Sequence, residues 1–365
     1  MPFVNLAFDQ RGLSESQIGL MNALPGILII VVTPFISRMA DLRKKRVLFL
    51  NLGFLLAGIF IGMQSFPLGF FWLLVLQLVA ALFLGSTTPI MNAVTARMGR
   101  KYHIDYGNWR LWGSFSFASA AFLMGMLWEK IGIQWVFLFT AGLYLLSGFV
   151  SLFLEEPEGE KVEVKSQSGM KWLPTDIAVW LFLFSAFFAN MGMNPFNQFS
   201  AIYMIRLGGT AALAGLMRTA SALVEVPAMW FASKLEKRIG SLGVFLISTV
   251  VFALAWLGFS VATAPWMLIA ITAFRGVGFG LATVSTIMYL DRKAKISEAA
   301  SYQSLHTSLV FGLAPLIAGP LGGILAENFG LPTTFKFASY IGWVSTFCIL
   351  LVFVRKWHTS REIIK

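Results

Sequence analysis

Two charged residues, Arg218 and Glu225, lie inside an apolar segment that runs from Leu213 to Phe231. At ~1.5 Å per helical residue this segment can cross a hydrocarbon core ~30 Å thick. A charged side chain at that depth costs at least ~2.5 kcal/mol on insertion scales, so both residues are candidates for a functional site. Seven residues make two helical turns, so we expect both side chains to face protein or water on one side of the helix.

The chemistry that this pair offers depends on what surrounds the carboxylate. Burial raises the pKa of a carboxyl group and a nearby cation lowers it, so Glu225 could load and release a proton. The alternative is a permanent ion pair with Arg218 that only fixes helix packing.

Two further groups could take part in ionic chemistry within apolar segments. Arg275 has no carboxylate in its own helix before Asp291, so a fixed cation here needs a partner elsewhere, either an anionic substrate or Glu225. His306 is a second titratable candidate for proton coupling, although a hydrogen-bonded packing role is an equal alternative.

Uncharged polar residues gather on the segment from 173 to 204. Asn190, Asn194 and Asn197 recur at helical spacing on one face, and Pro195 interrupts the helix between them. These amides predict a solute-binding wall at a kink, or hydrogen bonds that hold helices together. We expect Asn5 to line the same cavity.

Composition identifies the elements that must position these residues. The chain is 57% hydrophobic and 12% charged, with a mean hydropathy of +0.75, which is typical of a polytopic helical membrane protein. The single cysteine, Cys348, can form no internal disulfide. We find no metal-spaced His and Cys cluster, nucleophile elbow or phosphate loop, so the sequence predicts no enzyme, metal site or cofactor.

The net charge of +11 follows the loops. Most of the 28 Lys and Arg residues fall on one side of the predicted helices, in the segments 38–46, 97–101, 161–171, 234–238, 292–295 and 355–365. The other side carries only Arg11, Lys130, Arg206 and Lys336. Under the positive-inside rule the first set is cytoplasmic, and this pattern makes a nucleic-acid partner unexpected.

The hydrophobic segments form a group of five and a group of six. We predict helices at 17–38, 47–66, 70–96, 106–128, 133–154, 173–204, 212–233, 241–262, 265–290, 299–326 and 333–354. A polar stretch divides the chain into an N-terminal bundle at 1–154, a cytoplasmic loop at 155–172 and a C-terminal bundle at 173–365.

An internal repeat relates the two groups. Ile18-Gly-Leu-Met21 aligns with Ala214-Gly-Leu-Met217 at a shift of 196 residues, and Glu129-Lys-Ile-Gly132 aligns with Glu327-Asn-Phe-Gly330. By this repeat the first helix should begin about twenty residues before Met1. We therefore expect a first helix that is largely missing, and a full-length protein with both termini in the cytoplasm.

The segment Ser37-Arg-Met-Ala-Asp-Leu-Arg-Lys-Lys-Arg46 resembles the loop signature of the major facilitator superfamily. Ala40, Asp41, Lys45 and Arg46 fit the pattern, whereas Ser37 and Lys44 replace its two glycines. This resemblance implies an all-α fold of two six-helix bundles. Asp41, with Arg38 and Arg46, could then form a gating contact that breaks between transport states, or a static helix cap.

Tyr106-Gly-Asn-Trp-Arg-Leu-Trp-Gly-Ser114 is similar to the stretch that opens the fifth helix in oligosaccharide:proton symporters, phenylpropionate permeases and nucleoside:proton symporters. The resemblance implies that Arg110 anchors substrate and pairs with Glu225, and that Trp112 could stack on a ring-shaped substrate. Glu225-Val-Pro also fits these families. Arg275 stands where related symporters often have a histidine, which favours an anionic substrate here.

These observations predict a secondary transporter that moves a small organic solute across a cell membrane by alternating access, with proton symport as the expected mechanism. The solute could be a sugar, a nucleoside or an aromatic acid. We expect a multi-pass monomer of the inner or plasma membrane whose partners are the solute, protons and lipid. The alternatives are a proton-driven exporter of amphipathic compounds and a membrane sensor that transports nothing.

Overall fold

The computed structural model describes residues 2–102, 106–156, 174, 176–293 and 299–362. Within these ranges the regular structure is helical, as the composition predicts. The side chains of Asp41, Arg110 and Trp112, three of the predicted site residues, lie outside the described part of the chain.

The first group of helices follows the predicted segments closely. It comprises α1 (Pro2–Gln10), α2 (Glu15–Leu42), α3 (Arg46–Met63), α4 (Phe70–Lys101), α5 (Tyr106–Ile131), the short 3-10 helix η1 (Ile133–Trp135) and α6 (Val136–Ser151).

The second group comprises α7 (Ile177–Arg206), α8 (Ala211–Val261), α9 (Pro265–Lys293), α10 (Ala299–Thr307), the π-helix η3 (Ser308–Leu313) and α11 (Ala314–Glu362). Two of these helices turn at a glycine, Gly240 in α8 and Gly330 in α11, with φ of 74° and 79°. Only glycine adopts such angles readily. Both parts of α8 pack against α9, at Gly276 and Gly258, so the chain reverses direction at Gly240. The predicted boundary between 212–233 and 241–262 is confirmed.

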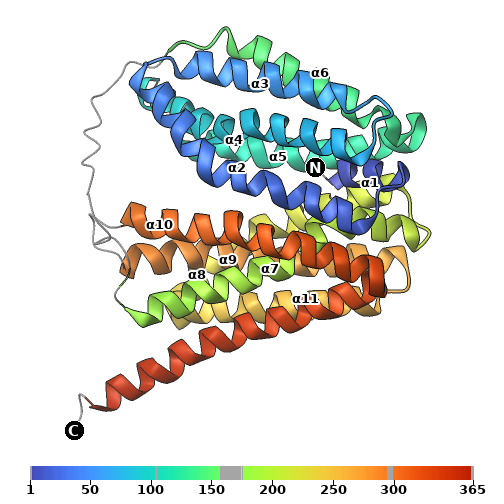
Figure 1. Cartoon of the computed structure of the whole chain (residues 1–365). Coiled ribbons are helices and arrows are strands. Elements are labelled where there is room, and N and C mark those ends of the chain that lie inside the picture. The colour runs from blue at the N-terminus through green and yellow to red at the C-terminus, as the bar shows by residue number, and fades with distance from the viewer. Residues whose placement is uncertain (1, 103–105, 157–173, 175, 294–298, 363–365) are drawn as a thin grey trace.

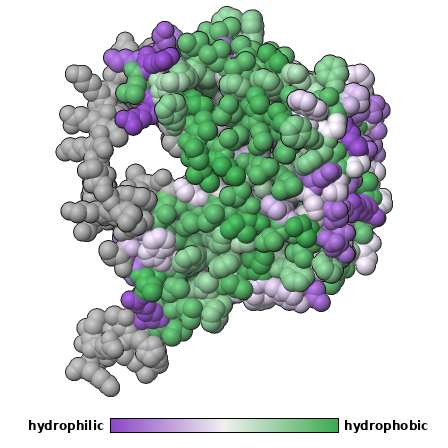
Figure 2. Space-filling view, in the orientation of Figure 1, coloured by the Kyte–Doolittle hydropathy of each residue, from purple (hydrophilic) through white to green (hydrophobic). Residues whose placement is uncertain are grey.

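The helices have the length and polarity of membrane spans. Among the described residues eight helices are long and apolar enough to cross a bilayer, and two of these are 51 residues long. Figure 2 shows hydrophobic side chains over the middle of one face, with hydrophilic side chains gathered towards its two ends. This distribution matches an apolar belt between two aqueous boundaries.

The two groups form two bundles (Figure 1), with α2–α6 in one and α7–α11 in the other. We name the two ends of the molecule by their residues. The sealed end carries Glu15, Glu129, Arg206 and Glu327, and the basic end carries the charged residues around Arg38, Lys234 and Arg292.

At the sealed end the bundles touch through backbone atoms. A Cβ built on Gly19 of α2 would lie 2.5 Å from the carbonyl oxygen of Gly319 in α11, and one built on Gly125 of α5 would lie 2.6 Å from that of Ala211 in α8. Helices approach this closely in a membrane only where the crossing residues are small. α2 with α11 and α5 with α8 therefore form two tight crossings between the halves.

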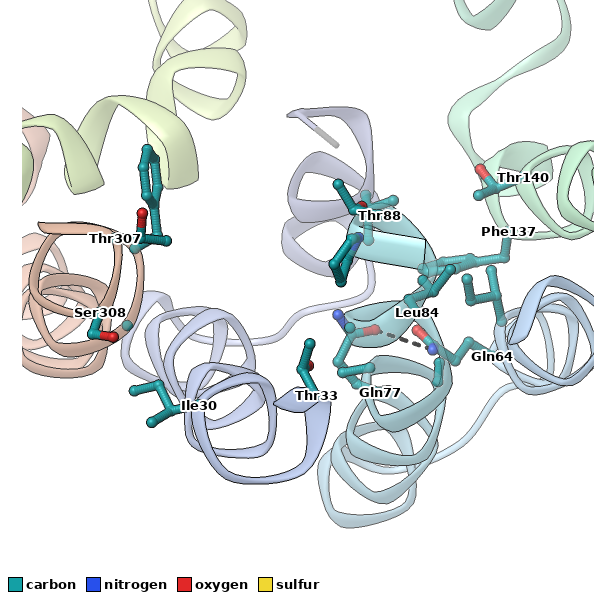
Figure 3. Close-up of a pocket in the computed structure, with 18 residues that line it drawn as sticks. Ile30, Thr33, Gln64, Gln77, Leu84, Thr88, Phe137, Thr140, Thr307 and Ser308 are labelled. Atoms are coloured by element: carbon teal, nitrogen blue, oxygen red, sulfur yellow. Dashed lines mark hydrogen bonds between the residues drawn. The ribbon is translucent and has the colours of Figure 1, made fainter. Parts of the chain in front are cut away.

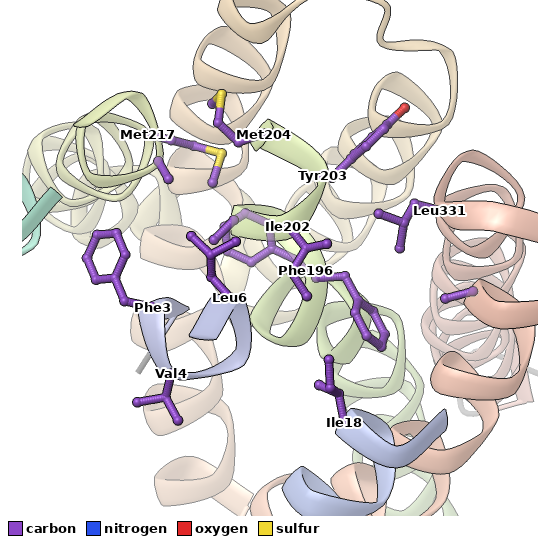
Figure 4. Close-up of a cluster of buried hydrophobic side chains, with 14 of the residues drawn as sticks. Phe3, Val4, Leu6, Ile18, Phe196, Ile202, Tyr203, Met204, Met217 and Leu331 are labelled. Carbon is purple, nitrogen blue, oxygen red and sulfur yellow. The ribbon is translucent and has the colours of Figure 1, made fainter. Parts of the chain in front are cut away.

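A shared hydrophobic core and ion pairs reinforce this end. One buried cluster contains side chains of both halves, with Phe3 and Leu6 of α1 lying near Phe196 and Ile202 of α7 (Figure 4). Arg206, at the end of α7, pairs with Glu15 at 2.6 Å and Asp9 at 3.0 Å. The sealed end is thus closed by contacts that run between the halves.

At the basic end each half has a core of its own. One buried cluster around Ala40, Leu50 and Ile90 lies wholly in the first half, and another around Phe182 and Tyr289 lies wholly in the second. The halves are therefore not held together here by a common hydrophobic core among the described residues.

Candidate functional site

The buried ring of Phe196 in α7 is the centre of a charged cluster. The guanidinium carbon of Arg218 lies 4.1 Å from the ring centroid, and that of Arg275 lies 4.6 Å from it. Phe196 has no exposed surface. Both distances fit cation–π contacts, which are strongest in desolvated sites. The structure thus brings together two of the predicted site residues, from α8 and α9.

Hydrogen bonds hold each arginine in place. One terminal nitrogen of Arg218, Nη2, donates to the hydroxyl of Ser200 at 2.9 Å and to the carbonyl of Phe196 at 3.2 Å. Nη2 of Arg275 donates to the hydroxyl of Ser221. The Nε atoms of both arginines are buried and have no protein acceptor. Each cation therefore keeps hydrogen-bonding capacity that the protein leaves unused.

Glycines in α9 bring Arg275 to this position. A Cβ on Gly276 would lie 2.6 Å from the carbonyl oxygen of Ser221, and one on Gly280 would lie 2.7 Å from that of Glu225. The close approach lets the α9 arginine reach the α8 backbone region that carries Ser221 and Glu225. Glu225 is half-buried and interacts electrostatically with Arg275.

Arg218 and Glu225 are not directly joined. The ion pairs of the described residues include none between these two side chains, so a permanent Arg218–Glu225 pair is absent in this state. The two guanidinium groups are close enough to repel each other, and Glu225 offsets this through Arg275. Among the described residues, the result is a partly buried cluster of two cations and one carboxylate.

The α7 amides occupy different surroundings. Asn194 is buried and donates to the carbonyl of Asn190 one turn earlier at 3.0 Å, while Asn197 is exposed. Asn5 is buried, donates to the carbonyl of Gln198 at 3.1 Å and accepts from Asn22 at 3.1 Å. Asn5 thus ties α1 to α7 and α2.

A cavity of about 280 Å³ joins two other predicted residues. Asn190 and His306 both line it, together with Phe279, whose ring also contacts Arg275 at 5.5 Å. The cavity lies among α7, α8, α9, α10 and η3, next to the charged cluster. A π-helix such as η3 places extra backbone bulk in one turn and often occurs at functional sites.

A larger cavity, of about 590 Å³, is lined mainly by the first half (Figure 3). Gln64, just after the end of α3, donates to the side-chain oxygen of Gln77 in α4 at 3.2 Å inside it, and Thr307 and Ser308 approach from the second half. None of the described residues that line it is charged. Sequence reasoning missed these residues. The available signal was an isolated polar side chain in an apolar helix, as with Gln77 and Thr88 on one face of α4.

The predicted gating residues lie at the basic end. Arg38 is exposed, Arg46 is buried at the first residue of α3, and the side chain of Asp41 lies outside the described part of the chain. The amides of Arg46 and Val47 donate to the carboxylate of Glu156 at 2.7 and 2.9 Å. Glu156, in the predicted loop between the halves, therefore caps this helix start, and a static cap was one of the two roles that the sequence left open for Asp41.

Another charged contact at the basic end joins α9 to the start of α7. Asp176 accepts from the amide of Ala178 at 2.8 Å and pairs with Lys293 at 2.8 Å. The hydrogen bond from Lys293 is the largest effect on the carboxyl group, and it lowers the pKa of Asp176 below its ordinary value. This contact lies within the second half.

Two helical bundles with tight crossings at one end and a charged cluster between apolar helices define a membrane transporter of the major facilitator type. The chain matches the MFS_1 like family over residues 1–337 and belongs to that family.

Comparison with individual proteins agrees with this assignment. The chain is 24% identical to the maltose permease of Geobacillus stearothermophilus over 355 residues, which cover 97% of this chain and 90% of that protein. It is 24% identical to the probable 3-phenylpropionic acid transporter of Escherichia coli strain K12 over 262 residues, 71% of this chain and 69% of that protein. These relatives are transporters, and this chain is a transporter rather than an enzyme.

Solved structures show the same fold. A variant of the nucleoside transporter NupG matches with a TM-score of 0.85 at 15% identity, covering 97% of this chain and 95% of that chain. A bacterial homologue of the iron transporter ferroportin in an inward-facing state matches with a TM-score of 0.73 at 19% identity, covering 97% and 93%. The predictions of an all-α membrane protein and of the major facilitator superfamily are confirmed.

Proposed function

We propose that this transporter is a proton symporter for a small organic solute, with Glu225 as the group that carries the proton. The observation that supports this most is the electrostatic contact of a half-buried carboxylate with Arg275, while Arg218 is engaged by Phe196 and Ser200. A half-buried carboxylate that interacts with a cation of a neighbouring helix can change its proton occupancy as access to water alternates.

The arginines then act on the substrate and on the carboxylate. Arg218 and Arg275 supply fixed positive charge, and their unused Nε donors suit the oxygens of a hydroxylated or anionic solute. Asn190 and His306, which line the neighbouring cavity, are proposed as further contacts. Arg110 remains the proposed substrate anchor by its motif. The solute classes open to test are sugars, nucleosides and aromatic acids, which include those named for the relatives.

The test is solute uptake into proteoliposomes with an imposed proton gradient, across a panel of these three classes. We expect one class to enter several-fold faster with the gradient. Glu225→Gln should abolish that stimulation while leaving exchange of solute across the membrane without a gradient. Asp291→Asn, which changes an exposed carboxylate on α9, is the matched control and should keep full stimulation. Full gradient dependence in Glu225→Gln would overturn the proton role.

A second candidate function is proton-driven export of amphipathic compounds. It is favoured by the 590 Å³ cavity, whose lining, as far as the structure describes it, is uncharged and includes Phe137 and Phe311. A multidrug resistance efflux pump homologue of Lactococcus lactis is 22% identical over 92% of this chain. Inverted vesicles that accumulate a fluorescent amphipathic dye, together with no uptake from the solute panel, would select this function.

A further inference from the structure

At each tight crossing of the sealed end, a glutamate of one half contacts the first turn of a helix that belongs to the other half. Glu327, on α11, accepts a hydrogen bond from the backbone amide of Ser16 in α2 at 3.1 Å. Glu129, on α5, accepts one from the backbone amide of Ala212 in α8 at 3.3 Å. Both contacts bridge the two bundles.

The two helix starts are otherwise capped in the same way. The hydroxyl of Ser14 accepts from the amide of Gln17 at 3.3 Å, and that of Thr210 accepts from the amide of Leu213 at 3.3 Å. The first amides of a helix lack partners within it, and its N-terminus carries partial positive charge. In each helix, a hydroxyl group of the same half accepts from one of these amides. A carboxylate of the opposite half accepts from another.

The internal repeat shows that these contacts are two copies of one arrangement. A shift of 196 residues places Ser14 on Thr210 and Ser16 on Ala212. Glu129 falls on Glu327 in the alignment of the repeat. Two copies of an arrangement, each reaching into the other half, bring the halves together symmetrically.

Neither contact can survive separation of the bundles. A Cβ on Gly323 would lie 2.5 Å from the carbonyl oxygen of Glu15, and a Cβ on Gly125 would lie 2.6 Å from that of Ala211. The helices thus touch beside each glutamate, and moving them apart must break the hydrogen bond to the amide. Both glutamates are exposed, so water can replace each lost partner and the contact can form again.

We propose that Glu129 and Glu327 form a matched pair of latches that hold the sealed end shut, and that the transport cycle breaks and remakes both. They are positioning residues, since they set the balance between transporter states and touch no solute. The proposal rests on the transporter class alone and holds for any coupling ion. Glu129 and Glu327 lie at the end opposite Arg38, Asp41 and Arg46, the residues for which the sequence predicted a gating contact.

The experiment measures distances across the sealed end in the whole chain, reconstituted in nanodiscs without solute or gradient. Spin labels are placed on cysteines at Gln134 and Lys336, two exposed residues of opposite halves, in a Cys348→Ser background. In the parent protein we expect short distances to dominate. In the double variant Glu129→Ala with Glu327→Ala, the long-distance population should rise about fivefold to tenfold, because two charge-assisted hydrogen bonds are lost.

Matched controls and a milder variant complete the test. Lys130→Ala with Asn328→Ala changes the two neighbouring exposed residues and should leave the distances unchanged. Glu129→Gln with Glu327→Gln keeps the shape and one acceptor oxygen, so it should shift the distances in the same direction by less. A parent-like distance distribution in both glutamate double variants would overturn the proposal. Because neither solute nor proton gradient is present, the result is independent of the role of Glu225.

Discussion

The sealed end and the basic end are formed by the same helices, but their polar contacts connect different partners. At the sealed end, Arg206 pairs with Glu15 and Asp9, and Glu129 and Glu327 reach amides of the opposite bundle. At the basic end, Asp176 with Lys293 and Glu236 with Arg292 join helices of one half.

The hydrophobic cores differ in the same way. One core is shared by both halves at the sealed end, and separate cores stabilise each half at the basic end. A bundle with its own core can move as a rigid body. The difference teaches that, among the described residues, the shared hydrophobic core and the ion pairs between the halves gather at the sealed end, whereas the cores at the basic end belong to one half each.

The largest effect is expected from breaking a helix crossing at the sealed end. Gly215→Leu forces a side chain against the backbone of Ala121, and overpacking costs about 1 to 3 kcal/mol. If the sealed end opens to relieve this clash, the fraction of molecules with that end open should rise about fivefold to 150-fold. The measurement is alkylation of a cysteine introduced at a helix terminus of the sealed end. Gly142→Leu is the control, because a Cβ there meets nothing within 4 Å. Unchanged alkylation would contradict a tight crossing at Gly215.

A smaller effect is expected from Arg206, which sharpens the comparison between the two crossings. Arg206→Ala removes both ion pairs, and pairs this exposed contribute about 0.2 to 1 kcal/mol each. The sealed end should open about twofold to 30-fold more often, as measured by the same spin labels at Gln134 and Lys336. Lys130→Ala, which removes an exposed cation at the sealed end and is measured with the same spin labels, is the control. A shift equal to that of the control would show that these ion pairs do not bias the end.

The smallest effect is expected at the basic end, where the contact of Asp176 with Lys293 lies within one half. The pKa of Asp176 is lowered in the folded protein, so its stabilising contribution is present above the ordinary carboxyl pKa of about 4 and is lost as pH falls through the lowered value. Asp176→Asn keeps a side chain that can cap the helix. It should lower the free energy of unfolding at pH 7 by at most about 1 kcal/mol, and the unfolding temperature slightly.

Thermal unfolding in detergent at several pH values checks this expectation. The difference between parent and Asp176→Asn should shrink below about pH 4, because the carboxyl group becomes neutral there. The spin-label distances at the sealed end should not change. A change in those distances would show that the basic end also influences the contact between the halves.

Much of the fold could be predicted because the membrane imposes a simple pattern. Segments such as 47–66 and 265–290 are predominantly apolar, and a bilayer requires each such segment to be helical. The boundary between 212–233 and 241–262 was also visible, since Gly240 follows a basic cluster. The site was predicted only in part. Arg218, Arg275 and Glu225 stood out as charges in apolar helices, whereas Gln64 and Gln77 carried no such signal.

The sequence by itself determined the helical class, the charge asymmetry of the loops and the repeat, because these depend on residue types and spacing along the chain. Tertiary structure decided the partners. Two helical turns separate Arg218 from Glu225 by about 11 Å along the axis, so sharing a face does not join them. The approach of α7 instead gave Arg218 a partner in Phe196, and the crossings at the sealed end brought Glu129 and Glu327 to helix starts that lie 83 and 311 residues away in the sequence.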